Sequence, residues 1–238
     1  MQEAYLEEAL REVGLEVGAA EAARLAAYAA MVVEAGRRMN LTGARSWEEL
    51  VDRHIVDCLV GISKVDWSGV GGALDVGSGA GLPGIPLAII RPEVKVGLVE
   101  ARQKKAEFLR RCVGRLKLEN AVVVRERAEV LGRRSDWREK EERVLARGVA
   151  PLAVLLEYCL PLLAEGGWLV AWKGPGVDQE LTAAQVALAE LGGRVGRIYG
   201  YRLKGGRERR LVLVEKVAAT PAAYPRRPGI GAKRPLGV

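Results

Sequence analysis

The sequence predicts an α/β fold with a mostly parallel seven-stranded sheet, an antiparallel edge strand and a helical N-terminal extension. Three observations carry this prediction. A strand-like run over 73–76 enters a glycine-rich turn, strand-like and helix-like segments then alternate, and two final apolar runs flank a hairpin-like turn at Lys204–Arg207. With 238 residues, the chain is long enough to bury a core without disulfides or metals.

The first 64 residues are expected to be helical. Leu25, Tyr28 and Val32 follow the three-then-four spacing of one apolar helix stripe. Ser46 and Glu49 form a capping box for the next helix. Because the run 66–72 breaks the periodicity, we expect a helical cap over 1–68, a Rossmann-like α/β domain over 69–216 and a basic tail over 217–238.

The middle of the chain alternates between the two kinds of element. We expect strands near 73–76, 94–99, 121–125, 143–146 and 167–172. Between and after them we expect helices near 83–91, 102–116, 151–163 and 178–191. The last two strands, near 195–201 and 209–215, close the sheet as an antiparallel hairpin.

The turn that follows the first strand is typical of a nucleotide-binding site. Its glycines permit backbone angles closed to other residues and let a ligand approach the main chain: Gly77, Gly79 and Gly81. Glu100 lies about twenty residues further on, where Rossmann-like folds place a carboxylate on ribose hydroxyls. The turn fits both NAD and S-adenosylmethionine, and Asp75 with the extra leading glycine favours S-adenosylmethionine.

Composition and charge narrow the class of protein. The net charge is +7 and the isoelectric point is near 9.5, which suggests a polyanionic partner. Cys58, Cys112 and Cys159 lie far apart without metal or disulfide spacing, so we expect small core residues, no metal site and a reducing compartment. Since no signal core or membrane-length apolar run is present, we expect a cytoplasmic protein away from membranes, and a monomer by default.

The tail after residue 216 is rich in proline and basic residues. Such a segment is either a mobile solubilising end or an arm that binds nucleic acid. Tyr224 next to two arginines favours RNA, because aromatic rings and guanidinium groups both stack on bases. The expected RNA-binding residues are Arg226, Arg227, Lys233 and Arg234.

Together, several motifs resemble the RsmG family, also called GidB, of bacterial 16S ribosomal RNA guanine-N7 methyltransferases. The matching segments span nearly the whole chain: Asn40–Thr42, Arg53–Asp57, Asp75–Pro86, Leu118–Asn120, Ala146–Arg147, Lys173–Gly174 and Tyr224–Gly229. The sequence departs from many relatives at Gly148, and some members lack the basic tail. The resemblance implies a class I S-adenosylmethionine-dependent methyltransferase that acts on 16S ribosomal RNA or the small ribosomal subunit, and not on DNA.

Position and resemblance together assign the cofactor side. These residues are Asp75, Gly77, Gly79, Gly81, Leu82, Glu100, Ala101, Arg102, Ala128, Glu129 and Arg147. Ala128 and Glu129 are expected to flank the adenine, or else to form an ordinary exposed loop. Guanine N7 carries a lone pair and no proton, so we expect methyl transfer without an obligatory general base, mainly through positioning.

On the substrate side we place Arg147, Lys173, His54 and Asp57, each with a structural alternative. His54 and Asp57 lie three residues apart on one helix and either pair with each other or face the RNA. Arg147 either contacts ligand or forms a structural ion pair, and Lys173 is otherwise a solvated strand-end lysine. An NAD-dependent oxidoreductase and a ribosome-binding module that senses the cofactor without turnover are the alternative functions.

Overall fold

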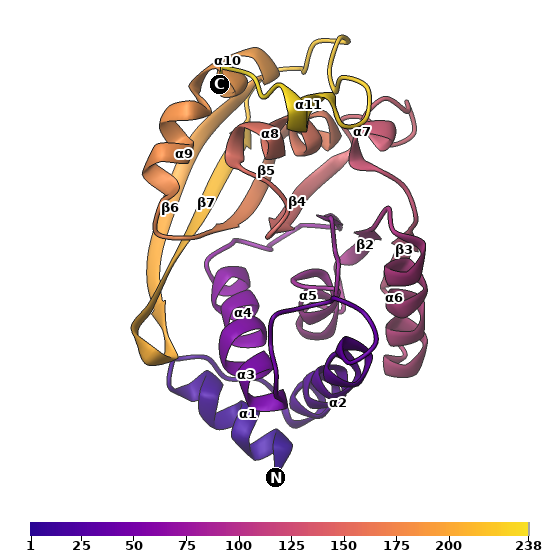
Figure 1. The fold of residues 1–238 in the computed structure, drawn as a ribbon, viewed down its shortest axis with the longest axis vertical. Helices are drawn as coiled ribbons and strands as arrows, with labels where there is room; N and C mark the ends of the chain where they lie inside the picture. The colour runs from indigo at the N-terminus through magenta and orange to yellow at the C-terminus, as the bar shows by residue number, and fades with distance from the viewer. Residues whose placement is uncertain (238) are drawn as a thin grey trace.

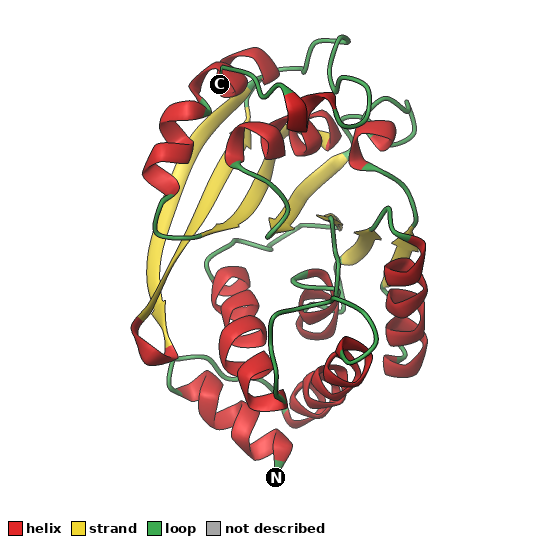
Figure 2. Ribbon diagram, in the orientation of Figure 1, coloured by secondary structure: helices red, strands yellow, loops and turns green. Residues whose placement is uncertain are grey.

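The chain forms one twisted sheet between two layers of helices (Figures 1 and 2), in a computed structural model that describes residues 1–237. The strand order is β3-β2-β1-β4-β5-β7-β6. The bounds are β1 Gly72–Val76, β2 Lys95–Val99, β3 Ala121–Val124, β4 Glu141–Arg147, β5 Leu163–Lys173, β6 Gly193–Leu203 and β7 Arg207–Lys216. The predicted seven-stranded sheet is therefore confirmed, with each strand within a few residues of its expected place.

The antiparallel strand differs in position from the expectation. Strands β1 to β5 pair in parallel, whereas β7 is antiparallel to both β5 and β6. Strand β7 thus lies inside the sheet, and its hairpin partner β6 forms the edge. This insertion lets the short turn at Lys204–Gly206 bring the end of the chain back beside β5.

Alternation along the strands separates two apolar cores. Ala73 and Leu98 point to one face of the sheet and belong to the first core. Leu74 and Val99 point to the other face and belong to the second core. The first layer contains α1 Gln2–Arg11, α2 Ala19–Gly36, α4 Val56–Ser63, α5 Gly84–Ile90 and α6 Gln103–Leu116. The second contains α7 Ala128–Leu131, α8 Leu152–Cys159, α9 Val177–Ala183 and α10 Gln185–Leu191. The N-terminal helices therefore share one continuous core with the sheet.

Two predicted helices are interrupted. The expected helix over 178–191 is divided at Ala184 into α9 and α10. The helix that starts at the Ser46 cap consists of α3 Trp47–Leu50, a π-helical turn over Val51–Ile55 and α4. Because a π turn widens the helix and changes the direction of its side chains, it is often found at functional sites.

The C-terminal tail, for which the sequence left a mobile end and an RNA-binding arm as alternatives, packs against the rest of the chain. Within the described part of the tail, Gly229 lies next to the short helix α11 Ile230–Lys233, and the segment packs against α7 and α8 (Figure 1). The last residue of the predicted tail, 238, lies outside the described residues. Among the helices of residues 1–237, none is long and apolar enough to span a membrane.

Candidate active site

The glycine turn lies at the carboxyl end of β1, where open α/β sheets bind ligands. Gly77 and Gly81 have φ angles of +71° and +98°, a region that favours glycine. A Cβ atom at Gly81 would lie 2.5 Å from Ile85 Cδ1, so both backbone angle and space require glycine. The Gly77 and Ser78 amides donate to the Val99 carbonyl, which ties the turn to β2.

Asp75 is completely buried beneath this turn. Its Oδ2 atom accepts a 3.0 Å hydrogen bond from the Gly84 amide at the start of α5. Its Oδ1 atom has no hydrogen-bond partner among residues 1–237, and burial raises the pKa of the carboxyl to about 7. Asp75 thus fixes both ends of the turn, and its free oxygen is an acceptor available to a bound donor.

The Glu100 carboxylate closes the other side of the turn. Its Oε2 accepts from the Gly79 amide at 3.0 Å and its Oε1 from the Arg102 amide at 2.7 Å. Each oxygen keeps a free lone pair, so the side chain, fixed by two backbone donors, can still accept from ribose hydroxyls. The predicted neighbours differ in exposure: Ala101 and Arg102 are exposed, whereas Leu82 is buried.

Ala128 and Glu129 begin α7 and are buried. They therefore do not form the exposed loop of the alternative interpretation. One oxygen of Glu129 accepts a 3.0 Å hydrogen bond from the Gly229 amide of the tail. Glu129, which is expected to flank the adenine, is thus held by a tail residue 100 positions further along the chain.

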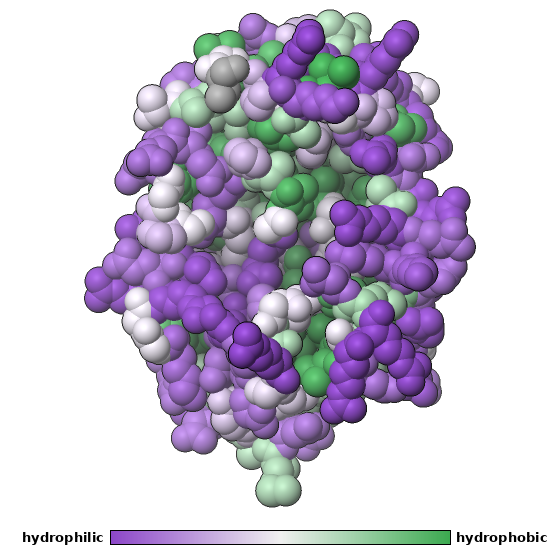
Figure 3. All heavy atoms as spheres, viewed as in Figure 1, coloured by the Kyte–Doolittle hydropathy of each residue, from purple (hydrophilic) through white to green (hydrophobic). Residues whose placement is uncertain are grey.

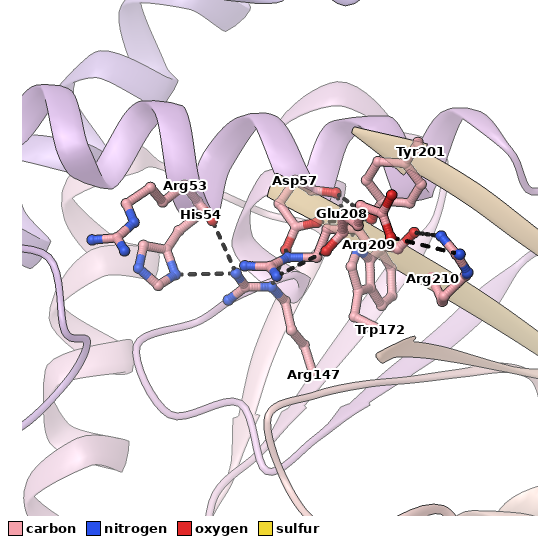
Figure 4. Close-up of polar contacts among 9 residues, drawn as sticks. All are labelled: Arg53, His54, Asp57, Arg147, Trp172, Tyr201, Glu208, Arg209 and Arg210. Atoms are coloured by element: carbon pink, nitrogen blue, oxygen red, sulfur yellow. Dashed lines mark hydrogen bonds and ion pairs between the residues drawn. The ribbon is translucent and has the colours of Figure 1, made fainter. Parts of the chain in front are cut away.

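Arg147 contacts the two residues that the sequence singled out before the first strand, His54 in the π-helical turn and Asp57 in α4. Its Nε donates to Asp57 Oδ2 at 2.8 Å, and its Nη2 lies 3.1 Å from His54 Nδ1. Figure 4 shows the Arg147 side chain between the two. The alternative in which His54 and Asp57 pair with each other is not realised, because the Arg147 guanidinium lies between them and contacts both.

Charge and hydrogen bonding fix the protonation of His54. Since arginine is only a donor, His54 Nδ1 must accept, which leaves the proton on Nε2. Burial, followed by the charge of Arg147, lowers the pKa of His54 to about 3. The imidazole is therefore neutral at physiological pH and presents one N–H donor.

Asp57 has further partners that sequence reasoning missed. Tyr201 donates to Asp57 Oδ1 at 2.7 Å, and the Trp172 indole donates to the Asp57 carbonyl at 3.0 Å. Arg209 Nε lies 3.7 Å from Asp57 Oδ2. These residues come from β5, β6 and β7 (Figure 4), so no local spacing in the sequence linked them to the helix that carries Asp57.

Lys173 fixes the loop after β4. Its Nζ donates to Glu180 Oε2 at 2.7 Å and to the Ala150 carbonyl at 2.8 Å. The solvated alternative for Lys173 is wrong, because β5 ends beneath this loop and leaves the side chain only 7% exposed. The loop includes Val149, whose Cγ2 would lie 2.8 Å from a Cβ added at Gly77.

The predicted RNA-binding residues of the tail fall into two groups. Arg226 makes a two-pronged ion pair with the buried carboxylate of Glu157, at 2.9 and 2.6 Å. This pairing leaves Arg226 as a structural residue instead of a free cation. Arg227, Lys233 and Arg234 are exposed.

Comparisons with known proteins agree on one family. The family model described as rRNA small subunit methyltransferase G, GidB, matches residues 21–211. A protein of that name from Pelotomaculum thermopropionicum is 43% identical over 97% of both chains. Another, from Roseiflexus castenholzii, is 44% identical over 94% of this chain and 95% of its own.

Solved structures agree on the fold. A methyltransferase from Aquifex aeolicus, described as SAM-dependent, covers 71% of this chain and 93% of its own, with 18% identity and a TM-score of 0.51. A predicted O-methyltransferase from Agrobacterium tumefaciens covers 69% and 82%, with 20% identity and a TM-score of 0.52.

Proposed function

The chain belongs to the family of rRNA small subunit methyltransferase G, and from this premise we propose that it methylates N7 of a guanine in 16S ribosomal RNA. It is an S-adenosylmethionine-dependent rRNA methyltransferase, which removes the NAD-dependent oxidoreductase as an alternative. The position of the methyl group and the mechanism are the proposal. The monomeric state and the absence of a DNA partner stay predictions.

The turn between β1 and α5 fits the cofactor. When bound, S-adenosylmethionine supplies a methyl group on a positively charged sulfur. We expect the Glu100 oxygens to accept hydrogen bonds from the ribose hydroxyls of the cofactor. We expect the glycine turn to lie against its methionine moiety. The Asp75 Oδ1 atom, which has no hydrogen-bond partner within residues 1–237, supports this fit, because a buried carboxylate oxygen without a donor is costly unless a ligand or water satisfies it.

One observation supports placing the methylated base next to His54, Asp57 and Arg147. Gly77 of the cofactor turn packs against Val149, two residues after Arg147, and β1 and β4 are neighbours in the sheet. The cofactor turn and the cluster of His54, Asp57 and Arg147 therefore lie side by side at the carboxyl ends of adjacent strands. A methyl donor at the first and a base at the second would be in contact.

The protonation of this cluster suits an acceptor that has no proton to lose. His54 is neutral, and the charge of Arg147 is balanced by Asp57, so neither is poised as a general base. The Nε2–H group of His54 is a donor of the kind that guanine O6 accepts. We therefore propose that the site orients guanine and excludes water, effects worth about 7–11 kcal/mol in well-oriented reactions.

The test is product analysis after methyl transfer. Purified protein, small ribosomal subunits that lack the modification and isotopically labelled S-adenosylmethionine are combined, and the RNA is digested to nucleosides for mass spectrometry. The proposal predicts labelled 7-methylguanosine. A label on another atom of guanine, or on another base, would contradict it.

A further inference from the structure

A basic groove on the first helix layer is not used by the proposed reaction. It lies between α2 and α6 and has a volume of about 580 Å³. Four arginines line it together with a single carboxylate: Arg38, Arg110, Arg111, Arg115 and Glu34. Figure 3 shows that hydrophilic side chains, drawn purple, predominate on the surface over α2 and α6.

The arginines of the groove have no structural task. All four are exposed, and within residues 1–237 none makes a side-chain ion pair or hydrogen bond. This contrasts with Arg147 and Arg226, whose guanidinium groups pair with buried carboxylates. A solvated helix face would explain single exposed bases, but here two elements place four like charges around one concavity, at an electrostatic cost that an anion would relieve.

The floor of the groove is apolar and adaptable. Met31 and Met39 are half-buried within it, and Phe108 lies beneath them. Flexible thioether side chains between guanidinium groups suit a ligand that combines negative charge with apolar faces, as a nucleic acid strand does. A protein partner would need acidic residues at matching positions, whereas a phosphodiester backbone repeats its charge along its length.

Both walls of the groove also hold the cofactor turn. Helix α6 starts at the Arg102 amide that donates to Glu100, and Arg110 to Arg115 follow about 12–20 Å along it. From α2, Tyr28 donates a 2.8 Å hydrogen bond to the Ala80 carbonyl of the turn. An RNA strand in the groove would thus be anchored to the same two helices that position the methyl donor.

We propose that the groove between α2 and α6 binds the phosphodiester backbone of the ribosomal RNA substrate outside the methylated nucleotide. Arg110, Arg111 and Arg115 supply the phosphate contacts from α6, and Arg38 supplies one from the end of α2. The inference rests on the proposed function, because that function supplies the RNA. It adds a second point of contact that the reaction site does not provide.

The test compares two triple variants of the full-length protein. The first, Arg110→Ala, Arg111→Ala and Arg115→Ala, removes the charges of α6. The second removes three exposed bases away from the groove and has the same net charge: Arg11→Ala, Lys64→Ala and Lys140→Ala. Binding of 16S RNA is measured between 50 and 200 mM salt, together with the melting temperature and the affinity for S-adenosylhomocysteine.

The groove variant is expected to bind RNA at least 10-fold more weakly and to lower the salt slope by about 3, one unit for each phosphate contact. Its melting temperature and affinity for S-adenosylhomocysteine should match those of the wild type. Equal losses of RNA affinity in both triple variants would overturn the proposal, because net charge alone would then explain the binding. RNA binding by the groove variant as tight as that of the wild type would also overturn it. If the wild type binds RNA in this way but methylates an atom other than N7, the proposed function fails and the groove stands.

Discussion

At the scale of single residues, the structure makes His54 a neutral donor instead of a titrating base. It is the one histidine of the chain, so its imidazole signal in an NMR spectrum needs no assignment. We expect this signal not to move between pH 8 and pH 5, because burial and the charge of Arg147 lower the pKa to about 3. A titration centred near 6.5, the value of a free imidazole, would contradict the site as described.

The same pKa has a consequence for stability. Since the unfolded chain binds a proton on His54 below about pH 6.5 and the folded chain does not until about pH 3, folding loses stability as the pH falls through that window. The variant His54→Gln is expected to lose less free energy of unfolding than the wild type between pH 7 and pH 5. Urea titrations at the two pH values measure the difference.

Glu100 is the residue with the sharpest prediction for ligand binding. Both of its oxygens accept from backbone amides, so in Glu100→Gln the amide nitrogen must face one of these N–H donors and orphan it. The variant also offers the ribose hydroxyls one acceptor oxygen instead of two and carries no charge. Losing a charge-assisted hydrogen bond to the ligand costs about 1.5–3 kcal/mol, which corresponds to a loss of affinity for S-adenosylhomocysteine of roughly 10- to 100-fold. Isothermal titration calorimetry measures the loss.

The matched control for Glu100→Gln is Glu107→Gln on the same helix. Glu107 is exposed, and its only described side-chain hydrogen bond within residues 1–237 is to Gln103. We expect its affinity for the ligand to equal that of the wild type. If both variants bind alike, Glu100 is not part of the cofactor site.

Sequence reasoning was most successful where chemistry is local. The glycine turn and Glu100 lie within one strand-turn-helix-strand unit, so spacing alone brought them together. Tyr201 and Arg209 were missed because they reach Asp57 from 144 and 152 residues further along the chain, and only the position of β7 inside the sheet brings them there. Asp75 was expected to contact the cofactor, and this contact stays a prediction; its burial and the hydrogen bond that it accepts from the Gly84 amide show that it also holds the turn.

At the scale of elements, the contact between α4 and β5 explains a glycine inside a helix. Gly61 packs against the Trp172 ring, and a Cβ atom there would lie 2.4 Å from it. We expect Gly61→Ala to lower the free energy of unfolding by about 1–3 kcal/mol through overpacking, although alanine favours the helix itself. It should also disturb the Trp172 hydrogen bond to Asp57 and so the neighbouring cluster.

Gly114→Ala on α6 is the corresponding control, measured by the same denaturant titration. A Cβ atom at Gly114 has nothing within 4 Å, so the substitution should stabilise the protein by about 0.5–1 kcal/mol. Equal effects at the two glycines would mean that Trp172 does not constrain α4.

The tail is the element whose behaviour differs most from the expectation. Its composition suggested a mobile or RNA-bound arm. A proline-rich segment can also be ordered, however, when side chains elsewhere in the protein accept hydrogen bonds from its backbone amides. Glu157 and Glu129 do this for the Arg226 and Gly229 amides, and neither carboxylate could be linked to the tail from sequence. Arg227, Lys233 and Arg234 are exposed, and their contact with RNA stays a prediction.

We expect Arg226→Ala to destabilise the protein by about 3 kcal/mol, because it leaves the Glu157 carboxylate buried without its partner. Trypsin should then cleave within the tail faster than in the wild type. Arg227→Ala removes the adjacent, exposed arginine and should change stability by less than about 0.5 kcal/mol. If the two variants unfold at the same urea concentration, the Arg226–Glu157 pair does not hold the tail.

At the scale of the whole molecule, the predicted helical cap does not have a core of its own. Its residues belong to the same apolar cluster as the strands, and Tyr28 reaches from α2 to the cofactor turn. Amphipathic spacing predicted α2 correctly, since Leu25, Tyr28 and Val32 are all buried in it. It could not indicate which surface that stripe would cover, and the boundary drawn at 68 stays a description of sequence composition.

In the proposed reaction site, three parts of the chain come together. The central strands present the glycine turn, the π-helical turn and α4 bring His54 and Asp57 to Arg147, and the tail contacts Glu129. The central claim is that this arrangement methylates N7 of a guanine in the small-subunit RNA.

The most direct measurement of that claim is the content of 7-methylguanosine in 16S RNA from cells with and without the protein, by nuclease digestion and mass spectrometry. The account predicts that one 7-methylguanosine disappears when the protein is absent, and that the wild-type chain restores it but Glu100→Gln restores much less. An unchanged 7-methylguanosine content in the absence of the protein would contradict the account.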